Sequence, residues 1–293
     1  MGIGVSFPGR DIGADPNAVR HFAQAAEELG FERLTFVDHV LHAAAVAEND
    51  PPWAPAYTVD NCIHEPMTLL AFVAAVTRSI KLVTANVILP QRQTVLAAKQ
   101  AAEVDVLSEG RLILGIGIGW NQLEYRALES DFENRGQRIE EQVLLMRRLW
   151  TERTLTFEGR WHGFDESGLN PQPVQQPIPI WFGAMADPAI RRAGRLGDGW
   201  LVFPLIGPDD DAKRKIEVFR SAAADAQRDP AALGIDATVY LNDGDIEGWT
   251  KEAEAWSSLG ATTVTFRTPD TGSGEIDQHI VAMDRLMSGY AAS

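Results

Sequence analysis

The chain has 293 residues, of which 45% are hydrophobic and 23% charged, a composition typical of a globular protein with a sizeable core. Its net charge of −15 argues against a nucleic acid or an anionic membrane as partner. No segment approaches the roughly 18 consecutive apolar residues of a membrane helix. The single Cys62 excludes an internal disulfide, and no cluster has the spacing of metal ligands. Because the N-terminus enters a strand-like pattern at once, we expect a soluble cytoplasmic protein.

Strand-like and helix-like segments alternate along the whole chain. Short apolar segments predict eight strands, at 3–7, 33–37, 81–89, 111–118, 178–182, 199–203, 237–241 and 263–267. Helical periodicity predicts eight helices, at 18–29, 67–77, 95–107, 137–151, 187–196, 209–227, 246–259 and 275–290. Strict alternation of eight such pairs at this length favours a single α/β domain over residues 1–293, a (β/α)8 TIM barrel, rather than a doubly wound sheet. Residues 154–163, before the fifth strand, form a possible hairpin.

The fourth predicted strand ends in alternating glycines, Gly115, Gly117 and Gly119. Their G-x-G-x-G spacing differs from the G-x-G-x-x-G of a dinucleotide fold. Glycine weakens a strand interior and often marks a bulge or a close approach to the backbone. Two interpretations stay open: a flat ring lies against the strand end, or the glycines ease a tightly curved strand.

Three polar residues lie where a barrel keeps its chemistry, near the carboxyl ends of strands. His39 closes the second strand and titrates near neutrality, so it is either catalytic or a hydrogen-bonded structural histidine. Glu65, just before Pro66, is either functional or a first-turn acidic residue favoured by the helix dipole. Asn86 interrupts the apolar third strand, which indicates either a bulge or an amide that binds the edge of a ring.

The segment 183–188 follows the fifth strand and opens a helix. Asp187 is a candidate N-cap, with Pro188 in the first turn. Free backbone amides at such a helix start bind anions, and Arg191 and Arg192 one turn later are candidates to add charge, as is Arg92 elsewhere. The alternative interpretation is that the segment 183–188 is a capped helix start that binds no ligand.

Taken in chain order, several segments resemble the luciferase-like family of flavin- or deazaflavin-dependent oxidoreductases. The most specific are GRLILGIGIGW (110–120) and GDGW (197–200). Others are FVDHV (36–40), HEPMTLLAFVAAVT (64–77), LVTANVILPQRQTVLAAKQAAEVDVLSE (82–109), FENRGQRIEEQVLLMRRLW (132–150), PQPVQQPIPIWFGA (171–184), IRRAGRLGDGWL (190–201) and ATTVTFR (261–267). The resemblance extends from the first strand to the eighth and implies the same (β/α)8 barrel.

Within this family one subgroup uses FMN, as reduced flavin with oxygen, and another uses the deazaflavin coenzyme F420 for hydride transfer. The sequence is more similar to the second, chiefly through the compact segment after the fifth strand and the helix 64–77. The resemblance therefore implies an oxidoreductase that transfers a hydride between F420 and a small organic substrate. Two alternatives stay open: an FMN-dependent two-component monooxygenase supplied by a separate reductase, and a flavin-binding barrel without turnover. We also expect a homodimer.

The resemblance places His39 near the redox face of the ring, as a general acid/base or a residue that orients the substrate. We expect Glu65 as a second catalytic residue. Trp53, Tyr57 and Trp120 are candidates for an aromatic substrate lid; the alternative is that they only pack within their loops. The expected cofactor-binding residues are Asp38, Thr84, Ala85, Asn86, Gly117, Ile118, Trp120, Gly183, Ala184 and Met185.

Two of these positions carry a more specific expectation. The segment 84–86 matches a place where family members often have a bulge, sometimes with a cis peptide. At the family's phosphate contacts, Ala184 and Met185 replace small or hydroxylated residues, so backbone amides are expected to do most of the binding.

Overall fold

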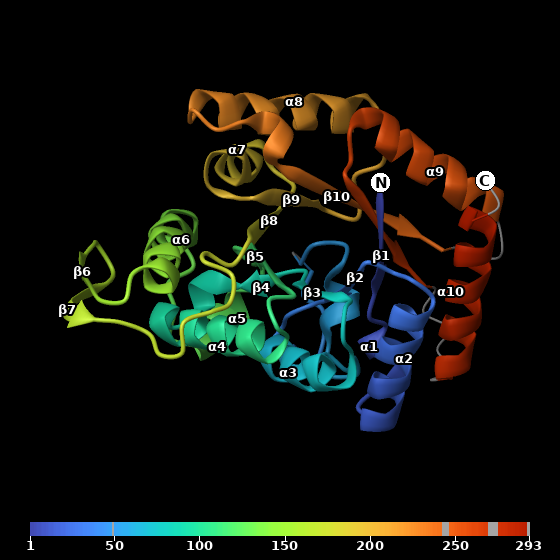
Figure 1. The fold of residues 1–293 in the computed structure, drawn as a ribbon, viewed down its shortest axis with the longest axis horizontal. Coiled ribbons are helices and arrows are strands. Elements are labelled where there is room, and N and C mark those ends of the chain that lie inside the picture. The colour runs from blue at the N-terminus through green and yellow to red at the C-terminus, as the bar shows by residue number, and fades with distance from the viewer. Residues whose placement is uncertain (49, 242–245, 269–274, 292–293) are drawn as a thin grey trace.

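The computed structural model describes residues 1–48, 50–241, 246–268 and 275–291, and in it parallel strands form a closed barrel with helices around it (Figure 1). In order around the barrel the strands are β1 (Gly2–Ser6), β2 (Arg33–Phe36), β3 (Lys81–Thr84), β5 (Leu112–Gly117), β8 (Ile180–Ala184), β9 (Gly199–Val202), β10 (Gly234–Tyr240) and β11 (Thr263–Arg267). Parallel pairing of β11 with β1 closes the ring. The predicted TIM barrel is confirmed.

Helices follow the strands and cover the outside of the barrel (Figure 1). They are α2 (Pro16–Glu28), α3 (Pro66–Val76), α4 (Thr94–Leu107), α6 (Arg135–Thr151), α7 (Asp187–Leu196), α8 (Asp210–Asp225), α9 (Ile246–Leu259) and α10 (Ile276–Ala291). All eight predicted helices are present, with ends that match or differ by one or two residues. Sequence reasoning missed the short helical pieces α1 (Gly9–Ile12), η1 (Ala54–Tyr57), η2 (Leu89–Gln91), α5 (Gln122–Ala127) and η3 (Pro230–Ala232). The suggested hairpin is present as β6 (Leu155–Glu158) and β7 (Gly163–Ser167), longer than predicted.

The third predicted strand is interrupted. Its two parts, β3 and β4 (Val87–Ile88), both pair with β5, and a cis peptide bond joins Ala85 to Asn86 between them. A continuous strand over 81–89 is therefore wrong, whereas the irregularity expected at 84–86 is present.

The lower half of the barrel is filled by side chains. The indole of Trp181 lies so close to β9 and β10 that a Cβ at Gly199 or Gly234 would come within 2.2 Å of it. Arg33 stacks over the same ring at 5.1 Å and pairs with Asp236 at 3.2 Å. Because the lower half is packed, the open space of the barrel lies at the carboxyl ends of the strands.

Two further findings concern the described residues alone. None of their helices combines the length and apolar character that crossing a membrane requires. Nor do they contain three or more His, Cys, Asp or Glu side chains grouped in a way that could hold a metal ion.

Candidate active site

A cavity of about 720 Å³ opens at the carboxyl ends of the strands. Most of the predicted site residues line it: Asp38, His39, Trp53, Tyr57, Ala85, Asn86, Gly117, Ile118, Trp120, Gly183, Ala184 and Met185. Thr84 and Glu65 are not part of its wall. Thr84 is fully buried and donates a hydrogen bond to the carbonyl oxygen of Gly115 at 2.7 Å, which joins β3 to β5 beneath the cavity.

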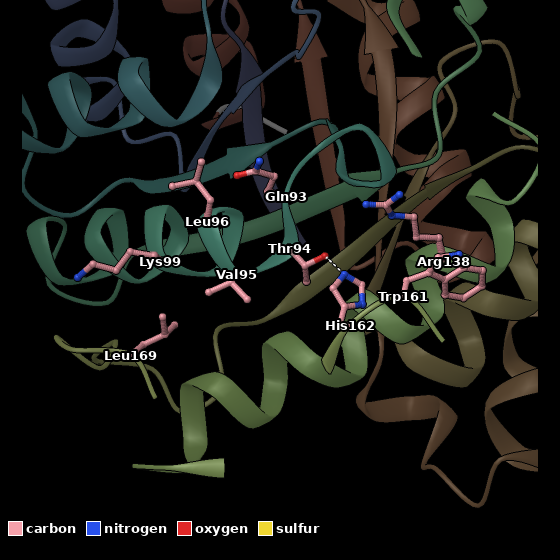
Figure 2. Close-up of a pocket in the computed structure, with 9 residues that line it drawn as sticks. All are labelled: Gln93, Thr94, Val95, Leu96, Lys99, Arg138, Trp161, His162 and Leu169. Atoms are coloured by element: carbon pink, nitrogen blue, oxygen red, sulfur yellow. Dashed lines mark hydrogen bonds between the residues drawn. The ribbon is translucent and has the colours of Figure 1, made fainter. Parts of the chain in front are cut away.

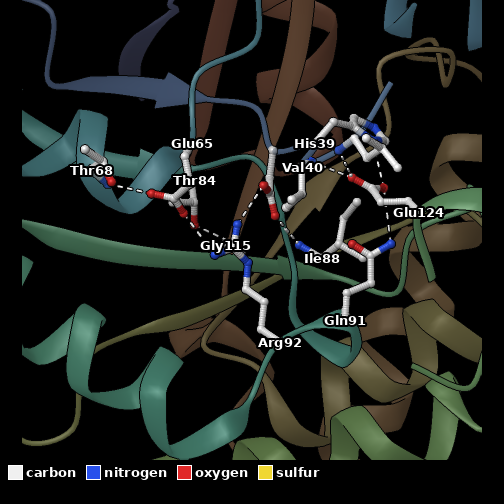
Figure 3. Close-up of polar contacts among 12 residues, drawn as sticks. His39, Val40, Glu65, Thr68, Thr84, Ile88, Gln91, Arg92, Gly115 and Glu124 are labelled. Atoms are coloured by element: carbon white, nitrogen blue, oxygen red, sulfur yellow. Dashed lines mark hydrogen bonds and ion pairs between the residues drawn. The ribbon is translucent and has the colours of Figure 1, made fainter. Parts of the chain in front are cut away.

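His39 forms a buried pair with a carboxylate that sequence reasoning missed. Its Nδ1 lies 3.1 Å from Oε2 of Glu124, which is fully buried on α5 (Figure 3). The other ring nitrogen, Nε2, has no hydrogen-bond partner among the described residues. Since an ionised carboxylate only accepts hydrogen bonds, Glu124 fixes the proton of the neutral imidazole on Nδ1. Nε2 is then left with a lone pair for a molecule in the cavity.

The surroundings of Glu124 keep it ionised. Burial alone raises the pKa of its carboxyl, but the hydrogen bond and charge of His39, the amide of Val40 and the side chain of Gln91 together lower the pKa below its usual value. The amide of Leu41 also donates to Oε1 at 3.2 Å, and Nε2 of Gln91 donates to Oε2 at 3.1 Å. The carboxylate therefore holds both the His39 ring and the backbone that follows it.

The sequence contains a signal for this helix. Asn121 caps α5 by accepting hydrogen bonds from the amides of Leu123 and Glu124, at 3.0 and 3.4 Å. An asparagine followed three residues later by a glutamate is a helix-start pattern, but in this helix the glutamate turns to His39 instead of back to the cap.

Glu65 holds a structural position rather than one at the cavity. It caps α3 by accepting the Thr68 amide at 2.7 Å, and it pairs with Arg92 at 2.9 Å (Figure 3). Arg92 also binds Asp38 at 2.8 Å, and the second oxygen of Asp38 accepts the amide of Ile88 at 2.9 Å. Burial raises the pKa of Asp38, and Arg92 opposes this shift. The structure thus supports the helix-start interpretation of Glu65 and ties the residue before His39 to β4.

The three alternating glycines have different surroundings. A Cβ at Gly115 would lie 1.7 Å from the carbonyl oxygen of Thr84, and Gly119 has a positive φ of 66° that favours glycine. At Gly117 the nearest atom, Cβ of Asn86, lies at an ordinary contact distance of 3.5 Å. The protein's own packing therefore requires glycine at 115 and 119, whereas Gly117 keeps open a part of the cavity wall.

Polar atoms at the cavity lack partners, as a ligand site would require. Oδ1 of Asn86 and Nε1 of Trp53 are buried without a hydrogen-bond partner in the described structure. Gly183 gives room to the Asn86 amide, because a Cβ at residue 183 would lie 2.0 Å from its Nδ2. One acceptor and one donor are thus held at the wall for an organic molecule that can satisfy them.

Helix α7 starts at the cavity without a capping side chain. Its N-cap is Ala186, which also lines the cavity, and not Asp187 as predicted. Asp187 instead pairs with Arg214 at 2.8 Å, and Arg192 with Glu140 at 3.0 Å, so neither adds a charge to the cavity. The uncapped amides and the helix dipole make this end of the wall suited to a phosphate group.

Aromatic rings cover the His39 side of the cavity. The ring centroid of Tyr57 lies 4.3 Å from that of His39, and Trp120 lies 5.8 Å away. Trp53 packs edge-on against Phe203 at the end of β9, with centroids 4.9 Å apart. The loop after β2 therefore reaches across the mouth to the far strands.

A second hollow, of about 580 Å³, lies outside the barrel at the start of α4 (Figure 2). None of the predicted site residues lines it. Its histidine, His162, is held between Oγ1 of Thr94 at 2.6 Å and Glu141 at 2.7 Å. This hollow thus also holds a histidine–carboxylate pair, but both ring nitrogens of His162 have protein partners, so neither is left for a ligand.

The mouth of the barrel combines a histidine–carboxylate pair, a stretch of wall without a side chain at Gly117 and an uncapped helix start, an arrangement suited to an enzyme site for an organic molecule. Residues 2–286 match the model of the luciferase-like monooxygenase family, and the chain belongs to this family. Membership confirms the predicted family and the predicted enzyme class, an F420- or flavin-dependent oxidoreductase or monooxygenase.

Relatives of both kinds occur. An F420-dependent hydroxymycolic acid dehydrogenase of Mycobacterium tuberculosis is 30% identical over 87% of this chain and 66% of its own length. An FMNH2-dependent dimethylsulfone monooxygenase of Pseudomonas putida is 30% identical over 80% of this chain and 61% of its own. The solved F420-dependent secondary alcohol dehydrogenase in complex with an F420–acetone adduct shares the fold, with a TM-score of 0.80 at 17% identity over 99% of this chain and 98% of that one.

Proposed function

We propose that this protein transfers a hydride between coenzyme F420 and a small organic substrate with a hydroxyl or carbonyl group. The observation that carries the proposal is the His39–Glu124 pair, buried at the wall of a cavity large enough for a ring and a small molecule. F420, when bound, supplies the carbon that accepts or donates the hydride.

The residues present fit such a cofactor. Gly117 leaves a flat strip of backbone for the ring, and the unpartnered amide oxygen of Asn86 offers an acceptor for its polar edge. The phosphate would bind the uncapped start of α7, next to Gly183, Ala184 and Met185. The side chain of Met185 has no polar group for this contact and is 40% exposed, which supports binding through the backbone amides.

His39 acts on the proton that accompanies the hydride. In the oxidising direction the substrate carbon loses a hydride to the cofactor, and its hydroxyl loses a proton to Nε2 of His39; a carbonyl forms and the cofactor is reduced. Glu124 stabilises the imidazolium that results. In the reducing direction the same nitrogen returns the proton to the carbonyl oxygen. The aromatic rings of Tyr57 and Trp120 shield this transfer from water.

The second candidate is an FMN-dependent monooxygenase that receives reduced flavin from a partner reductase. It is favoured by the relative from Pseudomonas putida, which is 30% identical to this chain. The same cavity and histidine would serve it, and oxygen consumption with reduced FMN is its distinguishing property.

Parallel titrations of the purified protein with F420 and FMN, followed by fluorescence, test the proposal. We expect F420 to bind, and anaerobic reduction of bound F420 by a panel of alcohols to proceed. His39→Ala should keep F420 binding and lose about 10²- to 10⁴-fold in turnover. His21→Ala, on the exposed face of α2, is the matched control. Selective FMN binding with oxygen uptake would establish the second candidate, and a barrel that binds either cofactor without turnover would be a non-catalytic binding protein.

A further inference from the structure

Three threonines and an aspartate form a polar patch in the cavity wall, and the function proposed above does not use it. Thr35 lies on β2, Asp236 and Thr238 lie on β10, and Thr265 lies on β11. Thr35, Asp236 and Thr265 are at most 5% exposed. Because burying polar groups without hydrogen bonds is costly, the partners of each group in this patch decide what it can bind.

Part of the polar patch is satisfied within the protein. Oγ1 of Thr265 donates a hydrogen bond to the carboxylate of Asp236, at 2.9 and 3.0 Å from its two oxygens. Arg33, which does not line the cavity, pairs with the same carboxylate at 3.2 Å and balances its charge. Since Thr265 uses its only proton in this contact, its oxygen is left as an acceptor for a molecule in the cavity.

The other two hydroxyls of the patch are not engaged. Among the residues that the structure describes, no hydrogen bond involves Oγ1 of Thr35 or Thr238. Trp53 adds a donor on the same side, because its buried Nε1 has no partner and its ring packs against Phe203, at the end of the neighbouring strand β9. A hydroxyl offers one donor and two lone pairs, and an indole offers a donor alone. Donors and acceptors thus remain open along one side of the cavity.

The strand order places the polar patch across the cavity from the expected cofactor. β10 stands four positions from β3, and β11 stands four positions from β5, in either direction around the barrel. Asn86 follows β3, and Gly117 ends β5. A ring that lies against these two residues therefore turns its other face toward Thr238 and Thr265, and a substrate lies between the ring and the patch.

We propose that the polar patch and Trp53 bind a second hydroxyl group of the substrate, which is a polyol or a hydroxylated ketone. The proposal rests on the proposed function, because the first hydroxyl or carbonyl group is the one that reacts at His39. Thr35 precedes His39 by four residues on and just after β2, which separates their Cα atoms by up to about 13 Å. Several carbon atoms therefore separate the two substrate groups. A hydroxyl suits the patch because it both donates and accepts, whereas an anionic group would face the Asp236 carboxylate.

Pairs of alcohols with the same shape test this subsite on the F420-loaded protein. They are 1,4-pentanediol with 2-hexanol and 1,5-hexanediol with 2-heptanol, where a methyl group replaces the primary hydroxyl. Ligand-observed NMR with reduced F420, on which an alcohol cannot react, gives the dissociation constants, and turnover with oxidised F420 gives kcat and KM. We expect one diol to bind about 10- to 100-fold tighter than its methyl counterpart, which leaves buried polar groups unpaired. The preference should appear in KM and leave kcat nearly unchanged.

Substitutions that keep the side-chain shape locate the effect. Thr35→Val and Thr238→Val should each lower the ratio of diol to alcohol affinity by about 2- to 10-fold, the size of one hydrogen bond, by weakening the diol alone. A purely structural defect would weaken both compounds alike. Serine at either position should keep the ratio, and Trp53→Phe, which retains a ring without the N–H, should lower it. Thr154→Val, which changes an exposed threonine just before β6, is the matched control and should leave the ratio unchanged.

Three results would overturn the proposal. The first is a wild type that binds neither diol more tightly than its methyl counterpart, and the second is a preference that persists unchanged in both valine variants. The third is a loss of F420 affinity in these variants that parallels the loss of diol affinity, since the patch would then hold the cofactor. Failure of F420 to bind the wild type would instead count against the proposed function. The NMR titrations are then made on the cofactor-free protein, for which the patch predicts the same preference.

Discussion

Glu124→Gln is the substitution that probes the His39 pair most directly. Glu124 accepts hydrogen bonds from His39, Val40, Leu41 and Gln91, and all four groups face its two oxygens. A glutamine of the same shape has a single oxygen. If that oxygen stays with the backbone amides, the new NH2 group points at Nδ1 of His39 and at the Gln91 amide.

The expected consequence is a change of tautomer. Nδ1 of His39 would accept a hydrogen bond from the new amide, and the proton would move to Nε2, which could then no longer take a proton from the substrate. A comparable loss of the correct tautomer in a Ser-His-Asp triad lowers kcat by about 10⁴-fold, and general-base catalysis is worth about 10²- to 10⁴-fold. We expect a fall in kcat within this range for Glu124→Gln, with KM nearly unchanged. The new NH2 group would also face the NH2 group of Gln91, and these two buried donors without an acceptor between them should cost about 1–3 kcal/mol of stability.

Two measurements check this expectation. Single-turnover reduction of bound F420 reports the chemical step, and ¹⁵N chemical shifts of labelled histidine report which nitrogen of His39 carries the proton. The control is Glu129→Gln, which changes an exposed carboxylate just beyond the end of α5 and outside the cavity wall. An unaltered kcat together with an unaltered His39 tautomer would refute the assignment of Glu124 as the residue that positions His39.

Three further outcomes are expected. Gly117→Ala should fold normally and lose F420 affinity. Gly115→Ala should lose stability, because a Cβ at residue 115 would lie 1.7 Å from the carbonyl oxygen of Thr84. Thermal unfolding and cofactor titration of both variants distinguish these two effects. Glu65→Ala should lower stability by about 0.5–2 kcal/mol through loss of a helix cap and leave kcat unchanged, as measured by urea unfolding and turnover. The fold lowers the pKa of Glu124, so its ionised form stabilises the folded protein. This contribution is complete above the ordinary pKa of 4.5 and is lost as the pH falls through the lowered pKa. The acid-unfolding curves of the wild type and Glu124→Gln should therefore converge at low pH.

The barrel was predictable because its signal is spread over the whole chain. Eight apolar segments alternate with eight amphipathic ones, and no single one has to be placed correctly for the alternation to be recognised. His39 could be placed at the mouth for the same reason, since the carboxyl end of every barrel strand faces that side. The predicted start of β8 is two residues early and that of β10 three residues late, because burial on both faces leaves little change in hydropathy at a strand end.

The contacts of the site were not predictable in the same way. His39 and Glu124 are 85 residues apart in sequence, and their pairing depends on a six-residue helix that has too little periodicity to be recognised. For Glu65, by contrast, the sequence left a catalytic role and a helix-start role open, and the position of its side chain, which caps α3, supports the second.

The alternating glycines explain why one motif supported two interpretations. Residues two apart on a strand face the same side, so Gly115 and Gly117 both face the inside of the barrel at successive heights. At the lower height the backbone of the interrupted third strand comes against β5, and glycine is required by curvature and close packing. At the upper height the same face of β5 borders the cavity, and the missing side chain leaves space for a ligand. The curvature interpretation therefore holds at Gly115, and the interpretation that a ring lies against the strand stays a prediction, which concerns Gly117 alone.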